Sequence, residues 1–245
     1  MLLIPAIDLR SGRCVRLYQG DFNAETRYAV TAQDLAGRYR GLGATWLHVV
    51  DLDGAKNGVL ANRELIIDLV SSGLNLQVGG GVRSQEIVED LLAHGVRRVV
   101  VGSTAVEQPE TVRAWLSDFG TERVCLAFDV RLDAAGEPLV RTRGWTEDTR
   151  LTLWQALQPY GAAEASHVLC TDIARDGALA GPNLALYREA ATRFPQFAWQ
   201  ASGGVRDARD LAALAEAGMA GAVSGKALLE DRIGFEELQP FLPNA

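Results

Sequence analysis

The chain has 245 residues, 48% of them hydrophobic, and carries a formal net charge of −7. This size and apolar fraction suit one α/β domain over residues 1–245, and the acidic charge argues against nucleic-acid binding. No apolar run reaches the ~18 residues that a membrane span needs, and the first residues lack the basic region of a signal peptide, so we expect a cytoplasmic protein.

Eight short apolar runs along the chain have the length and composition of buried β-strands. Polar stretches at 11–28 and 132–149 predict long loops or small hairpins, the second turning at Ala135–Gly136. The predicted strands lie at 2–8, 44–53, 75–78, 96–103, 122–131, 166–172, 196–202 and 219–224.

Amphipathic runs with helical spacing lie between these strands. Thr31 and Ser84 are placed to cap two of them, and Pro109 falls in the first turn of a third. Residues 53–58 predict a loop, and a short extra helix is expected after the eighth strand. The main helices are predicted at 31–43, 62–73, 84–95, 108–120, 151–161, 184–194, 207–218 and 235–242.

Strict alternation of eight strands and eight helices predicts a parallel sheet with right-handed crossovers. This number favours closure into a (β/α)₈ TIM barrel, while an open doubly wound sheet stays possible. The glycine motifs do not match GxGxxG with a downstream ribose-binding acid, which argues against a dinucleotide-binding sheet.

One heptapeptide occurs twice, as QVGGGVR at 77–83 and QASGGVR at 200–206, with five identical positions at an offset of 123. Later glycines match at the same offset, so we predict a barrel built from two similar halves. Glycine turns that enter helices let backbone N–H groups approach an anion. The predicted phosphate-binding residues are Gly80, Gly81, Gly102 and Ser103 in one half, and Gly203, Gly204, Gly225 and Lys226 in the other.

Two such cradles half a chain apart suggest a ligand with a phosphate at each end. Single glycine turns also occur merely as strand terminators, and that alternative stays open for each turn by itself. Arg16, Arg83 and Arg206 are candidates to hold phosphate or aspartate, although Arg83 and Arg206 equally suit structural ion pairs.

Carboxylates and a hydroxyl follow the remaining strands, at positions that converge on one mouth of a barrel. Asp8 and Asp129 end the first and fifth strands on opposite walls. Thr171 lies at the end of the sixth strand, and Asp176 lies in the loop that follows it. Burial raises a carboxyl pKa toward neutrality, which suits general acid–base work. Alternatively, strand-end aspartates cap loops or pair with arginine.

Two aromatic side chains have open roles. Trp145, in a polar loop, suits either stacking on a flat heterocycle or packing the loop. His48 suits a core position or the orientation of a strand-end aspartate.

Lys226 fits a phosphate site better than Schiff-base chemistry. The cysteines and histidines show no metal-ligand spacing, so we expect no metal.

Taken together, IPAIDLRSGRCVRLYQGD, HVVDLDGAK, QVGGGVR, FDVR, TDIARDGALAGPN and SGKALLE resemble the ProFAR isomerases (phosphoribosylformimino-5-aminoimidazole carboxamide ribotide isomerases) of histidine biosynthesis. The resemblance runs from the first strand to the last helix, and TDIARDG with the GW loop is similar to the proteobacterial form. Ser224 departs from the aliphatic residue usual in the family and puts nothing essential in doubt.

The resemblance implies an Amadori rearrangement of the aminoaldose ProFAR, a bisphosphorylated ribonucleotide, to the aminoketose PRFAR, without metal or organic cofactor. It implies Asp8 as general base, either Asp129 or Asp176 as general acid, Thr171 near Asp129 or the ribose, and Trp145 stacked on the imidazole carboxamide. Its motifs also place Gly20 and Gly177 with Arg16 and His48 in the substrate site.

Three alternatives remain. The cyclase barrel of the same pathway is disfavoured, because its first loop carries a lysine where this chain has VRLYQGD. Side activity on phosphoribosylanthranilate stays open, and a catalytically inactive ligand-binding barrel is disfavoured by Asp8 and Asp129. The sequence does not specify the oligomeric state; we expect a monomer, and closure of loops 16–28 and 140–148 over substrate.

Overall fold

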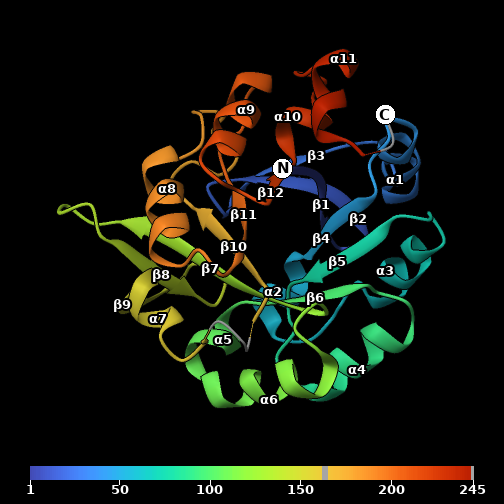
Figure 1. Ribbon diagram of the computed structural model, residues 1–245. Coiled ribbons are helices and arrows are strands. Elements are labelled where there is room, and N and C mark those ends of the chain that lie inside the picture. Colours follow the sequence, from blue (N-terminus) through green and yellow to red (C-terminus); the bar gives the residue numbers. More distant parts are fainter. Residues whose placement is uncertain (162–164, 244–245) are drawn as a thin grey trace.

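Within residues 1–161 and 165–243, which the computed structural model describes, eight parallel strands form a closed barrel (Figure 1). β12 pairs with β1 and β7 with β10, so the sheet has no open seam. The structure therefore confirms the TIM barrel. The strands are β1 (Leu2–Arg10), β4 (Trp46–Asp51), β5 (Asn75–Gly79), β6 (Arg98–Val101), β7 (Val124–Leu132), β10 (His167–Asp172), β11 (Ala198–Ser202) and β12 (Gly221–Ser224).

The predicted helices surround the strands (Figure 1). Thr31 caps the first as expected, its side chain accepting the backbone N–H of Asp34. Ser84 takes the N-cap position without a side-chain hydrogen bond. None of the described helices is long and apolar enough to cross a membrane. The helices are α1 (Ala32–Gly41), α3 (Arg63–Val70), α4 (Gln85–Ala93), α6 (Pro109–Phe119), α7 (Leu153–Leu157), α8 (Leu184–Arg193), α9 (Ala208–Glu216) and α11 (Phe235–Leu238).

Short helices also begin directly at strand ends. α2 (Leu52–Asn57) corrects the loop predicted at 53–58, and α5 (Ser103–Glu107) was not predicted at all. Asp51 caps α2 by accepting the N–H of Gly54 at 2.9 Å. α10 (Lys226–Leu229) is the expected extra helix, and a 3₁₀ turn at Gln239–Phe241 follows α11.

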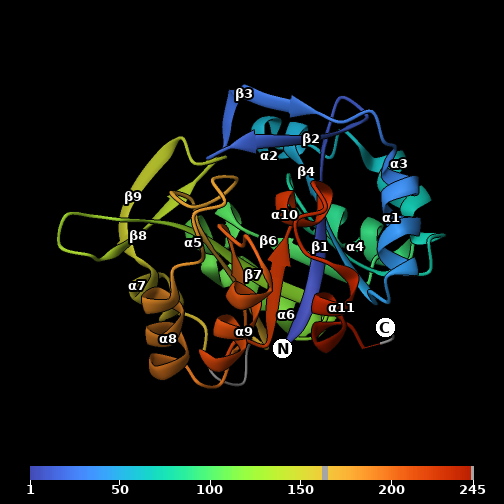
Figure 2. The same ribbon diagram turned by 90° about the horizontal axis from the view of Figure 1, so that it is seen from above.

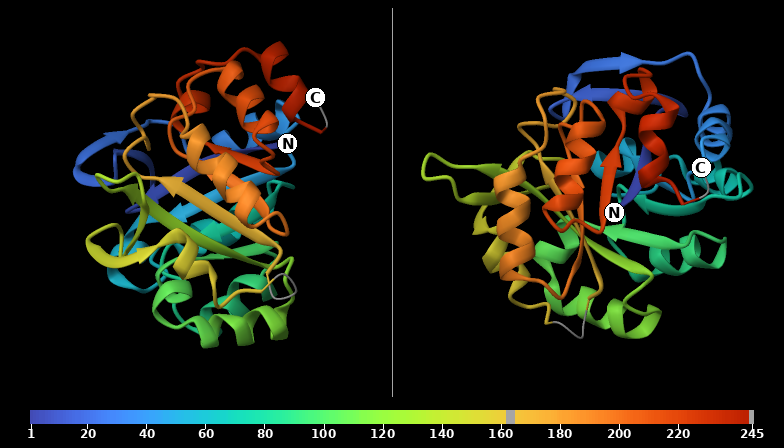
Figure 3. Two further views of the ribbon diagram at one scale, coloured as in Figure 1. Left: turned by 60° about the vertical axis from the view of Figure 1, so that its left-hand side comes forward. Right: turned by 45° about the horizontal axis from the view of Figure 1, so that its top comes forward.

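Two antiparallel hairpins extend from the barrel. The first, β2 (Arg13–Tyr18) with β3 (Asp21–Arg27), forms the small hairpin expected there. The second joins β8 (Pro138–Thr142) to the end of β7 and adds β9 (Glu147–Thr152), which the sequence did not predict. The left view of Figure 3 shows both hairpins on the side opposite the chain termini, and Figure 2 shows β2–β3 far from the N-terminus.

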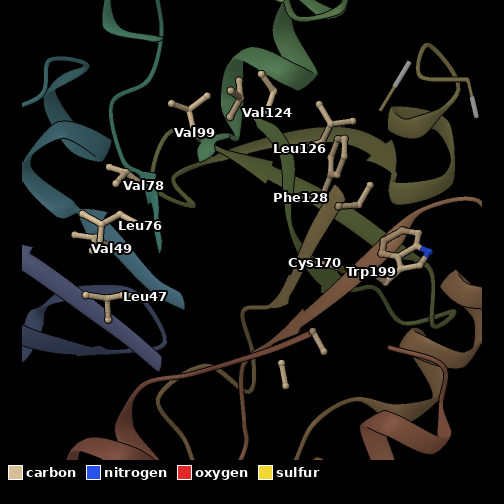
Figure 4. Close-up of a cluster of buried hydrophobic side chains, with 14 of the residues drawn as sticks. Leu47, Val49, Leu76, Val78, Val99, Val124, Leu126, Phe128, Cys170 and Trp199 are labelled. Carbon is tan, nitrogen blue, oxygen red and sulfur yellow. The ribbon is translucent and has the colours of Figure 1, made fainter. Parts of the chain in front are cut away.

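The largest apolar core lies between the barrel wall and the helices. Leu47, Val78 and Phe128 are among the side chains that fill it (Figure 4). A smaller cluster that includes Ile4 and Cys125 fills the barrel interior. The rigid wall therefore fixes where each strand ends, and with it the side chains that follow.

The half-barrel repeat is visible in matched contacts. Asn62 donates its side-chain N–H to Asp51 at 2.7 Å, and Asn183 does the same to Asp172 at 2.8 Å. The two pairs have the same sequence spacing and tie each loop back to its strand end. The sequence repeat therefore corresponds to a repeated structural unit.

Candidate active site

A single pocket at the carboxyl ends of the barrel strands gathers the predicted site residues. They come from strands, hairpins and loops in both halves, and Arg206 is the one candidate that does not line it. The lining includes Asp8, Arg16, Gly20, His48, Gly80, Gly81, Arg83, Gly102, Ser103, Asp129, Trp145, Thr171, Asp176, Gly177, Gly203, Gly204, Gly225 and Lys226.

The first glycine cradle requires glycine for reasons of space. Gly80 has φ +92°, and a Cβ there would lie 2.1 Å from the backbone oxygen of Asp51. Gly102 precedes α5, whose first residue is Ser103. The Ser103 hydroxyl accepts the backbone N–H of Arg143 at 2.9 Å, so the second hairpin lies against this cradle.

The second cradle has the same construction. A Cβ on Gly203 would lie 2.8 Å from the backbone oxygen of Asp172, the repeat partner of Asp51. Lys226 follows Gly225 at the start of α10, and its ammonium donates to the backbone oxygen of Gly177 at 3.1 Å. A lysine is thus held at the edge of this cradle.

The two arginines of the repeated motif have different surroundings. Arg83 lines the pocket and donates to the backbone oxygen of Ala55 at 2.8 Å. Arg206 instead forms a bidentate pair with Asp210, with both distances 2.9 Å. The structural alternative therefore holds for Arg206.

Asp8 pairs with an arginine from the neighbouring hairpin strand. Arg16 donates to Asp8 Oδ2 at 2.7 Å and also to the backbone oxygen of Ala6. Burial raises the pKa of Asp8, and the charge and hydrogen bond of Arg16 oppose that rise. The ion pair thus favours the ionised form of a carboxylate that burial would otherwise protonate.

Asp129 accepts two hydrogen bonds. Trp145 donates its indole N–H to Asp129 Oδ2 at 2.7 Å, and Thr171 provides the second bond. Burial raises the pKa of Asp129, while these two bonds lower it. The expectation that Thr171 lies near Asp129 is met.

The surroundings of Asp176 favour the protonated form of its carboxyl group. Burial is the largest cause that raises its pKa, to about 6, followed by the negative charge of Asp8. Arg16 opposes this effect, and Asp129 adds a smaller increase. Three carboxyl groups with raised pKa values therefore lie in one pocket, and Asp176 feels the negative charge of both Asp8 and Asp129.

Trp145 closes the pocket from the second hairpin against the first. A Cβ on Gly20 would lie 2.1 Å from the indole ring, so the ring packs directly on this glycine. His48 lines the pocket floor, but its partner is Gln77 and no aspartate. Sequence reasoning missed Phe22 and Ala55, which also line the pocket and carry no chemical signature.

No group of three or more His, Cys, Asp or Glu side chains is arranged to hold a metal in the described part of the chain. That no metal or organic cofactor is needed stays a prediction. The chemistry available in the pocket is that of three carboxyl groups between two glycine cradles.

A family model described as "Histidine biosynthesis protein" matches residues 2–234. A protein of Alteromonas mediterranea is 46% identical over 237 residues, which cover 96% of this chain and 97% of the relative. Proteins of Vibrio cholerae serotype O1 (45% identical, 96% and 97% covered) and Shewanella sp. strain MR-7 (43%, 99% and 100%) are similar. Their names describe an isomerase of an imidazole-4-carboxamide that carries two phosphoribosyl groups.

Proposed function

This chain belongs to the histidine biosynthesis protein family, and from that premise we propose that Asp8 and Asp176 catalyse the isomerisation for which its relatives are named. The chain is an isomerase of histidine biosynthesis that converts the aminoaldose ProFAR to the aminoketose PRFAR. The observation that carries the catalytic proposal is the position of the three carboxyl groups in one pocket with both glycine cradles.

The two cradles bind the terminal phosphates of the substrate. Gly80, Gly81, Gly102 and Ser103 hold one phosphate, and Gly203, Gly204, Gly225 and Lys226 hold the other, through backbone N–H groups and one ammonium. Arg83 adds a positive charge at the first cradle. The middle of the substrate then lies across the mouth, where the carboxyl groups face it.

Asp176 is the general acid. It protonates the ribose ring oxygen, and the ring opens to a Schiff base. A pKa of about 6 keeps part of the Asp176 population protonated near neutral pH, and it makes the protonated group a stronger acid than a typical amine or hydroxyl. Asp129 is the less suitable acid because Trp145 and Thr171 already donate hydrogen bonds to it.

Asp8 is the general base. It removes the C2 proton of the Schiff base, and the resulting enol-amine tautomerises to the ketose. Arg16 supports this role because its charge favours the ionised carboxylate. Two neighbouring carboxyl groups with opposite protonation states are a common arrangement for acid–base pairs.

Asp129 orients Trp145, whose ring stacks on the imidazole carboxamide. The 2.7 Å bond from the indole N–H fixes the ring over the pocket while Gly20 leaves room for it. Thr171 holds Asp129 in place or contacts the ribose. A cytoplasmic location and a monomeric state remain expectations.

The direct test is to treat the purified protein with a chelator and then to supply ProFAR. Conversion is measured from the change in absorbance or by separating the product from the substrate. Production of the ketose at a rate that scales with protein concentration supports the proposal. No conversion by folded protein, as judged by circular dichroism, contradicts it.

A further inference from the structure

Three neighbouring barrel strands carry polar side chains at one level. In the parallel register His48 of β4 lies opposite Gln77 of β5, and Gln77 lies opposite Arg98 of β6. All three are buried. The distance from Gln77 Nε2 to His48 Nδ1 is 3.1 Å. Gln77 Oε1 accepts a hydrogen bond from Arg98 Nη1 at 3.4 Å. The level below the pocket is thus a connected polar network.

Arg98 is held in one orientation by groups other than Gln77. Its Nε donates to the backbone oxygen of Glu122 at 3.0 Å, its Nη2 lies 2.7 Å from His167 Nε2, and its guanidinium stacks on the Trp46 ring at 4.4 Å. A guanidinium has only donors. The remaining nitrogen that faces Gln77 must therefore meet an oxygen.

This requirement fixes the amide of Gln77. Its Oε1 faces Arg98 and also accepts from Gln200 Nε2 at 3.2 Å. Its Nε2 donates one hydrogen to Gln200 Oε1 at 2.7 Å, which leaves the other for His48. A reversed amide would place a donor of Gln77 against the donors of Arg98, and it would keep both bonds to Gln200 only if that amide reversed as well.

The amide in turn fixes the protonation site of His48. Burial lowers its pKa to about 3, with Arg16 as a second cause, so the ring is neutral and carries one N–H. Nδ1 accepts the hydrogen of Gln77, so the proton is on Nε2. In the described part of the chain, Nε2 has no hydrogen-bond partner, and His48 lines the pocket.

We propose that Gln77, oriented by Arg98, is a positioning residue that holds His48 in the Nε2–H tautomer, so that His48 offers one donor to an oxygen atom of the substrate. The partner atom is an acceptor, since a substrate N–H at this place would meet a second donor. The substrate half of the inference rests on the proposed function. The tautomer does not, because it is a property of the protein alone.

The test is nitrogen NMR of protein labelled with ¹⁵N-histidine. The sequence has three histidines, so His94→Gln and His167→Gln variants assign the signals. Unliganded protein is expected to show a pyrrole-type Nε2 and a pyridine-type Nδ1 for His48. A His48 protonated at Nδ1, or an even mixture of tautomers, overturns the proposal.

Two substitutions at Gln77 separate the tautomer from packing. Gln77→Glu replaces the donor with an acceptor, so His48 is expected to gain a proton on Nδ1. Gln77→Met removes the donor without adding charge and is expected to give a mixture of tautomers. An unchanged Nε2–H signal in both folded variants overturns the proposal.

Gln200→Glu is the matched control. It places the same carboxylate in the same network. Within the described residues Gln200 exchanges two hydrogen bonds with Gln77 and makes none with His48. The His48 signals are expected to keep the wild-type pattern. A tautomer change in Gln200→Glu as large as in Gln77→Glu contradicts a specific role for Gln77.

Activity completes the test. Loss of one neutral hydrogen bond to the substrate predicts about a two- to tenfold lower kcat/KM for Gln77→Met, beyond any change in Gln200→Glu. An Nε2–H tautomer in a protein that does not convert ProFAR leaves the positioning role intact and refutes the proposed function instead. A mixed tautomer with undiminished kcat/KM refutes the donor role of His48.

Discussion

The indole N–H of Trp145 lies 2.7 Å from Asp129 Oδ2, so the loop that covers the barrel mouth is bonded to one of the three carboxyl groups inside it. Among the described residues no aromatic side chain donates to Asp176, whose pKa is raised mainly by burial and by the charge of Asp8. This difference separates the roles of the two aspartates, and it leads to the first prediction.

Asp176→Asn is expected to lower kcat by about 10²–10⁴, because it removes the proposed general acid. Asp129→Asn is expected to cost less in kcat and to raise KM, because the amide binds the Trp145 indole less well. Steady-state kinetics of both variants decide between them. The opposite ranking in kcat would assign the acid to Asp129.

Asp8→Asn is expected to lower kcat by about 10²–10⁴ while substrate still binds, because the amide cannot accept the C2 proton. Calorimetric titration with ProFAR measures binding separately from turnover. Exchange of the C2 proton with deuterated solvent should be lost as well. Turnover at the wild-type rate would exclude Asp8 as the base.

The raised pKa of Asp176 predicts that the stability of the fold decreases as the pH rises. Its pKa is raised from 3.8 to about 6 in the folded protein, so folding is favoured by protonation. The contribution is fully present below about pH 4 and is lost as the pH rises through about 6, a difference of about 3 kcal/mol. Chemical unfolding measures this effect at pH 4 and pH 8. The free energy of unfolding of Asp176→Asn, relative to that of the wild type, should be higher at pH 8 than at pH 4.

Asp118→Asn is the control for this experiment, because it removes an exposed carboxylate of α6 far from the pocket. Its effect on the free energy of unfolding should vary much less between the two pH values. If the free energy of unfolding had the same pH dependence in both variants, Asp176 would not be the buried carboxyl group that destabilises the fold at high pH.

Trp145→Ala is expected to raise KM about 5- to 150-fold, since stacking of an aromatic side chain on a base contributes about 1–3 kcal/mol. Trp145→Phe keeps a ring and loses only the N–H to Asp129, so its KM should rise less. The measurement is KM for ProFAR in both variants. Equal KM values for wild type and Trp145→Ala would show that the ring only packs the loop.

Gly80→Ala is expected to destabilise the fold and weaken phosphate binding, because its Cβ would lie 2.1 Å from Asp51 O. Gly136→Ala is the control, with a similar φ of +88° and no atom within 4 Å of the added Cβ. Both variants pay about 1–2 kcal/mol for the left-handed backbone. A similar loss of stability and affinity in both would contradict the close-approach argument.

The sequence predicted the barrel well because each strand has an apolar run and each half repeats a glycine motif. It failed where a short element depends on a neighbour. Residues 53–58 contain two glycines and predict a loop, yet Asp51 caps a helix there. The helix predicted from residue 151 begins instead at Leu153, because Leu151 belongs to β9.

The sequence predicted which residues lie in the pocket better than it predicted what each of them contacts. Strand ends located Asp8 and Asp129, but the partners that distinguish the carboxyl groups come from separate elements. Arg16 reaches Asp8 from a hairpin, and Trp145 reaches Asp129 from another. The link from His48 to Gln77 depends on strand register, which no local pattern specifies.

The matched pairs Asp51–Asn62 and Asp172–Asn183 enclose loops of equal length, so each position in one loop has a counterpart in the other. Ala55 is the counterpart of Asp176, and both line the pocket. If both glycine cradles bind phosphate as proposed, two similar halves would accept a nearly symmetric ligand in either direction. The methyl group of Ala55 stands where the other half has the carboxyl group of Asp176, so the two ends of the pocket differ. A ligand bound in the reverse direction would not meet the proposed acid.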